Sequence, residues 1–337
     1  MSVDPKPRRR WFRFSLRSLF VLLTLFCLTF GVVINRAERQ RRAVAAVWAA
    51  GGQVDYMVEG SPKERPETWF RDYLYHVRTV YLRDCFSADD LLKRLTAIPD
   101  LQALVLSGSD VTDHGLGQLA GLRNLRALYL CDTRITDAGL AQFSQLPRLT
   151  HLILQQTDIA DAGLQYLSGA TSLEHLDLSL TKIGDLGLAH LSSLRQLKFL
   201  DLWDTQTTND GLRSIRKLED LQDLDLSSTR VDDRGLAIIA DLPNLAELDL
   251  MNTAITDAGL VILSEQSHSL RYVILNETAA TDTGLHALGK IRSLKQLQLN
   301  NPEITQEALD EFKLAHPSIL ILLPAFPPNT PAENASS

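Results

Sequence analysis

The dominant feature of the chain is an apolar pattern that repeats every 24 residues over most of its length. Units of the form L-x-x-L-x-L begin at Leu101, recur at intervals of 24 up to Leu245, and continue at Leu270 and Leu294; a degenerate unit at Val77 precedes them. Counted from the first residue of each unit, apolar residues fall at offsets 0, +3, +5, +10, +15, +18 and +21. A fixed period of this length predicts a solenoid, in which each unit forms one coil stacked on the previous coil.

Within a unit, the offsets predict a short strand followed by a short helix. The alternation at +3 and +5 is that of a strand with two inward side chains, and the spacing of three at +15, +18 and +21 marks one face of a helix. A pair such as Thr136-Asp137 precedes the helix, where a hydroxyl and an acid suit the exposed amides and the helix dipole. A glycine recurs at +14, and we expect it to allow close backbone approach between this bend and the adjacent coil.

One hydroxyl position recurs at +8, where seven units carry threonine. Stacked coils would align these hydroxyls in a structural ladder that satisfies the carbonyls and amides of a buried bend. The predicted ladder comprises Thr133, Thr157, Thr181, Thr205, Thr229, Thr253 and Thr278.

The consensus L-x-x-L-x-L-x-x-T-x-I-T-D-x-G-L, as at residues 125–140, resembles the leucine-rich repeat superfamily. The variant is similar to bacterial membrane-anchored repeat proteins and to the repeats of F-box proteins. The resemblance implies an α/β solenoid, a leucine-rich-repeat horseshoe with parallel strands on the concave face and helices on the convex face, and protein binding as the usual role. Threonine replaces the ladder asparagine of the family, and no F-box-like segment precedes the repeats.

The N-terminal part of the chain predicts one transmembrane helix before the solenoid. The apolar residues 19–34 would span roughly 24 Å as a helix, and a start at Phe14 gives about 31 Å, close to the thickness of a hydrocarbon core. A cleaved signal peptide is the alternative, but the nearest small-x-small site, Ala43-Val44-Ala45, lies nine residues beyond the run and behind four arginines. Six basic residues before the run and four behind it favour a cytoplasmic N-terminus and a repeat domain outside the cytoplasm.

The solenoid needs a cap at its first coil, because an open end exposes the apolar core. We expect an alanine-rich helix at 43–50 that ends at Gly51-Gly52, a strand at 53–56 paired with the first coil, and apolar contacts from 69–75. The predicted segments are a basic cytoplasmic N-terminus at 1–17, a transmembrane signal anchor at 18–35, a juxtamembrane helix and N-terminal cap at 36–76, the repeat solenoid at 77–323 and a disordered tail at 324–337.

Charge and composition restrict the class of partner. The 337 residues carry a net charge of −7; residues 1–42 contribute +8, so the other 295 carry −15, which argues against nucleic acid. Three scattered cysteines exclude a disulfide-stapled scaffold, and no catalytic or nucleotide-binding motif occurs. We therefore predict a protein that is not an enzyme and has no cofactor and no small-molecule substrate. His151 and His175 stack near Asp177, but third and fourth ligands are not obvious, and we predict no metal site.

The outward strand positions predict a protein-binding surface on the concave face. Aspartate occupies offset +4 in four consecutive coils, which stacking would place about 4.8 Å apart. Carboxylates would steer a partner with a basic segment, and aromatic residues would anchor it. Alternatively, aspartate at this offset only keeps the concave face soluble. The predicted surface comprises Tyr129, Ile153, Asp177, Phe199, Asp201, Trp203, Asp204, Asp223, Asp225, Glu247 and Asp249.

The sequence thus predicts a membrane-anchored leucine-rich-repeat protein that binds or scaffolds another protein and contacts the lipid bilayer through residues 18–35. One alternative is a structural protein of the cell envelope that acts by self-association of its solenoids. A less favoured alternative is an F-box-like ubiquitin-ligase substrate adaptor, which the membrane segment speaks against.

Overall fold

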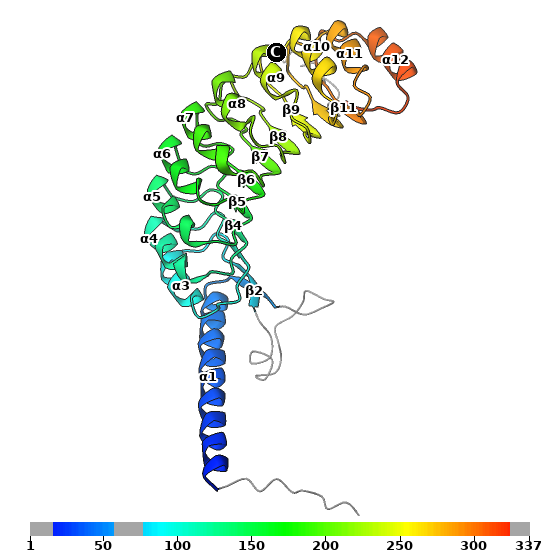
Figure 1. The fold of residues 1–337 in the computed structure, drawn as a ribbon. Coiled ribbons are helices and arrows are strands. Elements are labelled where there is room, and N and C mark those ends of the chain that lie inside the picture. Colours follow the sequence, from blue (N-terminus) through cyan, green and yellow to red (C-terminus); the bar gives the residue numbers. More distant parts are fainter. Residues whose placement is uncertain (1–15, 57–76, 324–337) are drawn as a thin grey trace, which may run out of the picture.

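The strands form one continuous sheet in which they lie side by side in chain order (Figure 1). The computed structural model describes residues 16–56 and 77–323. Within these residues β1 pairs antiparallel with β2, and each later strand pairs parallel with its neighbours. The strands are β1 (Gln53–Tyr56), β2 (Val77–Tyr81), β3 (Ala103–Val105), β4 (Ala127–Tyr129), β5 (His151–Ile153), β6 (His175–Asp177), β7 (Phe199–Asp201), β8 (Asp223–Asp225), β9 (Glu247–Asp249), β10 (Tyr272–Ile274), β11 (Gln296–Gln298) and β12 (Leu320–Leu322).

Short helices follow the strands and cover the convex side of the arc, while the sheet lines its concave side, as predicted (Figure 1). The α-helices are α1 (Leu16–Ala49), α3 (Ala88–Leu95), α4 (Asp113–Leu116), α5 (Asp137–Leu140), α6 (Asp161–Leu164), α7 (Asp185–Leu188), α8 (Asn209–Ile215), α9 (Asp233–Ile239), α10 (Asp257–Gln266), α11 (Asp282–Leu288) and α12 (Gln306–Ala315). Four 3-10 helices continue four of the shorter ones: η1 (Gly117–Gly121), η2 (Phe143–Gln145), η3 (Gln165–Leu167) and η4 (Ala189–Ser193).

The core runs through the stacked coils as a single apolar cluster that extends from the end of α1 to Ile319. The repeating apolar offsets supply it: in the unit at Leu125, the residues Leu128, Leu130, Ile135 and Leu140 are fully buried. Each strand therefore contributes inward leucines and presents the residues between them on the concave face.

The ladder threonines are buried, with 6–8% of each residue exposed. Each hydroxyl donates to the carbonyl three residues earlier at 2.5–2.9 Å, as Thr205 does to Leu202. Among the described residues, no hydroxyl of the set bonds to the next threonine, so each one satisfies the bend of its own coil. A bond between coils forms where Asn301 Nδ2 donates to Thr278 Oγ1 at 2.8 Å.

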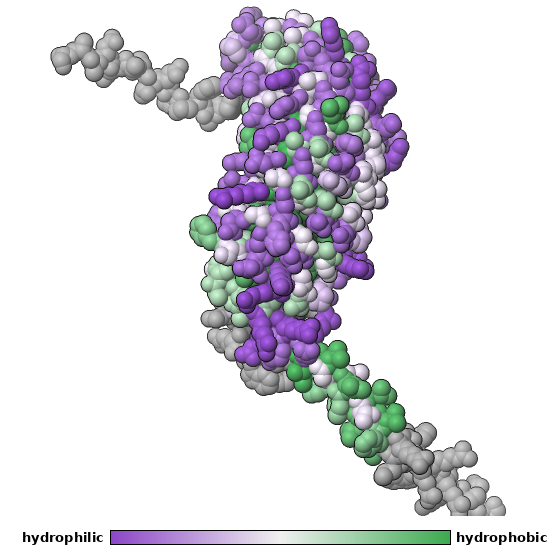
Figure 2. All heavy atoms as spheres, turned by 90° about the vertical axis from the view of Figure 1, so that its left-hand side faces the viewer, coloured by the Kyte–Doolittle hydropathy of each residue, from purple (hydrophilic) through white to green (hydrophobic). Residues whose placement is uncertain are grey.

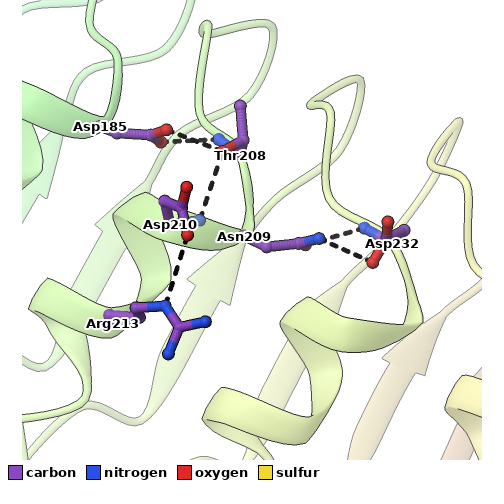
Figure 3. A network of polar contacts seen from close by, with 6 residues as sticks. All are labelled: Asp185, Thr208, Asn209, Asp210, Arg213 and Asp232. Atoms are coloured by element: carbon purple, nitrogen blue, oxygen red, sulfur yellow. Dashed lines mark hydrogen bonds and ion pairs between the residues drawn. The ribbon is translucent and has the colours of Figure 1, made fainter.

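The acid at offset +12 joins one coil to the next, a role beyond the predicted helix capping. Asp185 accepts hydrogen bonds from the backbone N–H of Thr208 at 2.8 Å and from its hydroxyl at 2.7 Å (Figure 3). Between the next two coils, Asn209 stands in place of the aspartate and Asp232 in place of the threonine. Asn209 Nδ2 donates to Asp232 Oδ1 at 2.7 Å, and the Asp232 N–H donates to Asn209 Oδ1 at 3.1 Å. The exchange keeps the link between coils without setting two carboxylates against each other.

The recurring glycine at +14 leaves room for this carboxylate. A Cβ at Gly163 would lie 2.5 Å from Asp137 Oδ1, and a Cβ at Gly211 would lie 2.5 Å from Asp185 Oδ1. Close approach was predicted correctly, but in these coils the nearest approaching atom is a side-chain oxygen of the preceding coil rather than backbone.

The coils turn their corners at offset +7 with a residue in the left-handed conformation. Asp204 has φ 51°, Asn252 has φ 54°, and Gly108 occupies the same offset with φ 71°. Leu180 adopts φ 56° at this position, where a bulky side chain without a local hydrogen-bonding group costs roughly 1–2 kcal/mol.

The cap differs from its prediction in one respect. The helix expected at 43–50 is the C-terminal end of the continuous 34-residue helix α1, whose Val44 and Val47 are at most 1% exposed against the first coil. The chain then turns at Gly51 and Gly52, and β1 adds to β2 as predicted. Of the basic N-terminus predicted at 1–17, residues 1–15 lie outside the described residues, and α1 begins at Leu16. The apolar contacts expected from 69–75 and the disordered tail predicted at 324–337 also lie outside the described residues.

Candidate protein-binding surface

Four aspartates stand in register on the concave face. Asp177 lies opposite Asp201, Asp201 opposite Asp225, and Asp225 opposite Asp249, on strands β6 to β9. A second acidic pair, Asp223 and Glu247, occupies the other outward position of β8 and β9 and is also in register. We call these six residues the acidic strip.

The four aspartates are half-buried and hold the bend that follows each strand. Asp201 Oδ1 accepts from the Trp203 N–H at 2.8 Å, and Asp249 Oδ1 accepts from the Met251 N–H at 2.8 Å. Asp177 and Asp225 bond in the same way to the serine two residues later. Part of their role is therefore structural. Within the described residues the second oxygen of each carboxylate accepts no hydrogen bond, which leaves it available to a ligand.

Burial raises the pKa values of four carboxyls of the acidic strip: Asp201, Asp223, Asp225 and Asp249. The pKa of Asp201 is raised to about 7, chiefly by burial and further by the charges of Asp177, Asp225 and Asp223. Burial and the neighbouring acids also raise the pKa of Asp223 to about 6 and of Asp249 to about 6. These residues occupy the outward strand positions as predicted, and the structure in addition withdraws them partly from water. A cation that approaches a free oxygen would stabilise the charged form of the carboxylate. It would thereby offset the free-energy costs of partial burial and of repulsion from the neighbouring carboxylates.

Aromatic rings lie beside the acidic strip on β5 to β7. The rings of His151 and His175 stack with centroids 4.2 Å apart, and that of His175 lies 5.8 Å from the ring of Phe199. Burial, together with His175, lowers the pKa of His151 and favours its neutral form. Trp203 lies two residues after the end of β7 and is half-buried. The described residues contain no group of three or more metal-ligating side chains suited to a metal ion.

The other predicted residues lie at the margins of the strip. Tyr129 and Ile153 continue the file of Asp177 along β4 and β5, where they make it apolar. Asp204 lies at an exposed corner rather than on the sheet, and it lines a groove of about 620 Å³ along the edge of the concave face.

Sequence reasoning missed this edge groove. It also contains Phe86, which is 87% exposed, with Arg134 and Lys182 at the same offset in later coils. An aromatic residue at offset +9, where the next four units carry charged residues, is the signal that points to it. Lys182 already pairs with Asp158 at 2.7 Å, so part of the charge in this groove is neutralised within the protein.

Comparison with known families agrees with the geometry. A family model described as "Leucine-rich repeat region" matches residues 72–318, so the chain belongs to the leucine-rich repeat family. Among solved structures, it is similar to an internalin C2 of Listeria monocytogenes, with 27% identity, a TM-score of 0.48, and coverage of 62% of this chain and 84% of that one. It is also similar to an internalin F of the same organism, with 18% identity, a TM-score of 0.40, and coverage of 69% and 83%. A search of curated proteins gives no match.

Proposed function

We propose that this leucine-rich repeat protein is anchored by α1 in a membrane, lies with its repeat body outside the cytoplasm, and binds a basic segment of another protein at the acidic strip. The single observation that carries the binding proposal is the register of four half-buried carboxylates, each with one free oxygen. We propose binding rather than catalysis, because repetition alone accounts for the pairing of these acids.

The length and exposure of α1 support anchoring. The helix is about 51 Å long, and its N-terminal half carries exposed apolar side chains from Leu19 to Ile34. Figure 2 shows this half as a hydrophobic rod that projects from a largely hydrophilic body. By length and composition alone the helix can cross a bilayer, and a signal sequence passes the same test.

Burial of the candidate cleavage site favours an uncleaved anchor over a signal peptide. Ala43 and Val44 are at most 2% exposed within the core of the first coil. Cleavage after Ala45 would remove both residues from the cap and separate them from Val47, which is fully buried. The apolar core at the solenoid end would then open to water.

A basic segment fits the electrostatics of the acidic strip. The carboxylates repel one another and have lost part of their hydration, so an arginine or lysine at their free oxygens restores a favourable partner for the charged form. Phe199 and Trp203 supply half-buried aromatic surface on the same strand and its bend, where a partner side chain can be anchored. The edge groove extends the contact surface beyond Asp204.

The convex face gives less support to self-association. Figure 2 shows this face as mostly hydrophilic. Its exposed large apolar side chains, such as Leu186 at 78% and Leu314 at 86%, belong to α7 and α12, which lie far apart along the arc. An interface between copies would need a contiguous apolar patch.

Site-specific photocrosslinking in cells tests the binding proposal. A photoreactive residue at Trp203 should capture a partner, and one at the convex residue Leu186 should not. The Asp201→Asn, Asp225→Asn double variant should lose the crosslink at position 203, because asparagine retains the bend-capping oxygen but removes the charge. Crosslinks only at position 186, or crosslinks at 203 that survive charge removal, would refute it. Protease accessibility of the repeat body in spheroplasts tests the orientation independently.

A further inference from the structure

A basic groove lies where α1 meets the first coil. It has a volume of about 410 Å³ and runs between the C-terminal half of α1 and the end of α3. Its lining is Arg39, Arg42 and Ala43 from α1, with Lys93, Arg94, Thr96 and Ala97 from α3 and the residues that follow it. None of these lining residues is acidic.

The four cations of this groove lack partners in the described part of the chain, where none of them forms an ion pair. Arg36, one turn before Arg39, is in contrast paired with Asp100. Lys93 and Arg94 lie in the last turn of α3, where basic residues suit the helix dipole. The dipole of α3 does not explain the position of Arg39 and Arg42, because these residues belong to α1. They bring two further positive charges close to Lys93 and Arg94. An anion in the groove would relieve the repulsion.

The position of the groove indicates the source of the anion. Arg39 and Arg42 follow the apolar residue Ile34 by about 8 and 12 Å along α1. If the apolar half of α1 spans a bilayer, Arg39 lies at the outer limit of the headgroup layer, which extends about 5–8 Å beyond each side of the hydrocarbon core. Arg42 lies about 4 Å farther out, a distance that its long side chain can cover by reaching back toward the membrane. The groove thus holds its four basic side chains next to the outer surface of the headgroup layer.

We infer that this groove binds the phosphate headgroup of an anionic phospholipid. The inference rests on the anchoring part of the proposed function and is independent of the acidic strip. Because α1 continues without a break into the buried cap, a headgroup held between α1 and α3 would give the body a second contact with the membrane. That contact would set the tilt of the arc relative to the bilayer and hence the direction that the concave face presents.

Lipid retention by the full-length protein tests the inference. The protein is reconstituted in nanodiscs that contain phosphatidylcholine and phosphatidylglycerol, transferred to detergent, and examined by native mass spectrometry for bound lipid. The groove variant replaces Arg39, Arg42, Lys93 and Arg94 by glutamine. The control variant replaces four exposed basic residues elsewhere on the body by glutamine: Arg195, Lys217, Lys290 and Arg292.

Each basic residue near an anionic surface contributes about fivefold to binding. We expect wild type and control to retain more phosphatidylglycerol than phosphatidylcholine. In the groove variant, the ratio of bound phosphatidylglycerol to bound phosphatidylcholine should be at least tenfold lower. Equal retention by all three proteins, or equal loss in the control, would overturn the inference. Binding of inorganic phosphate as tightly as the lipid would overturn the lipid as the source. Failure to float with neutral phosphatidylcholine vesicles would instead refute the anchoring, whereas flotation without lipid preference refutes only the groove.

Discussion

The hydrogen bond by which Asp137 joins its coil to the next one predicts that a side chain at Gly163 destabilises the fold. Replacement by alanine puts a Cβ 2.5 Å from Asp137 Oδ1 and 3.1 Å from both Asp137 Cγ and Leu140 Cδ1. Alanine gains about 1 kcal/mol over glycine in a helix. Against this gain, overpacking costs about 1–3 kcal/mol, and displacement of the carboxylate weakens its 2.8 Å bond to the Ala160 N–H, worth about 1.5–3 kcal/mol. We expect Gly163→Ala to lower the free energy of unfolding by about 2–4 kcal/mol.

Urea unfolding of the full-length protein in detergent, followed by circular dichroism, measures this loss. Gly169→Ala in the same coil is the matched control, because its Cβ would meet nothing within 4 Å, and it should be neutral or stabilising by up to about 1 kcal/mol. Asp137→Ala removes the clashing carboxylate, so the double variant should be less destabilised than the sum of the single variants. Equal effects of the two glycine substitutions, or strict additivity with Asp137→Ala, would refute the steric account.

Three further predictions follow from single positions. Asn209→Asp should lower the free energy of unfolding by about 1–3 kcal/mol, since it sets two carboxylates together, and Asp232→Thr should rescue it by restoring the Asp-Thr link of the other coils; no rescue in urea unfolding would contradict this. Leu180→Gly should raise the free energy of unfolding by up to about 1 kcal/mol through relief of its left-handed conformation, and a lower value would mean that packing of the leucine outweighs the strain. Asp201→Asn should stabilise the fold increasingly from pH 4 to pH 8, by about 1–2 kcal/mol after allowance for solvent screening of this partly exposed group. The folded state keeps a proton on Asp201 up to its pKa of about 7, whereas the unfolded state has released it, so wild-type stability from this group falls as pH rises through that window. The lowered pKa of His151 acts in the opposite direction, so the comparison is the difference between variant and wild type, and a difference independent of pH would contradict the prediction.

The repeat itself was predictable from sequence because each coil is specified locally. The offsets that place Leu128 and Leu130 in the core recur in every unit, so strand direction, strand order and register follow from stacking alone. The same reasoning placed Asp177, Asp201, Asp225 and Asp249 in one file, which the register confirms as a geometric arrangement.

Features that depend on contacts between coils were not predictable in the same way. The partner of Asp185 lies 23 residues away in Thr208, and the repeat pattern does not distinguish this contact from capping of its own helix. Half-burial of Asp201, and hence its raised pKa, depends on how closely adjacent strands and the following bend surround the carboxylate. The continuity of α1 was missed because the charged residues between 36 and 42 read as the end of a membrane segment, although they also continue a helix whose next turns cap the solenoid.

The most direct test of the central proposal is the affinity of the partner captured at position 203, measured by titration calorimetry against wild type and the Asp201→Asn, Asp225→Asn variant at pH 7.5. The account predicts that the variant binds at least about tenfold more weakly at low salt and that the difference shrinks when ionic strength is raised to about 1 M. Equal affinities of the two proteins at low salt would contradict it.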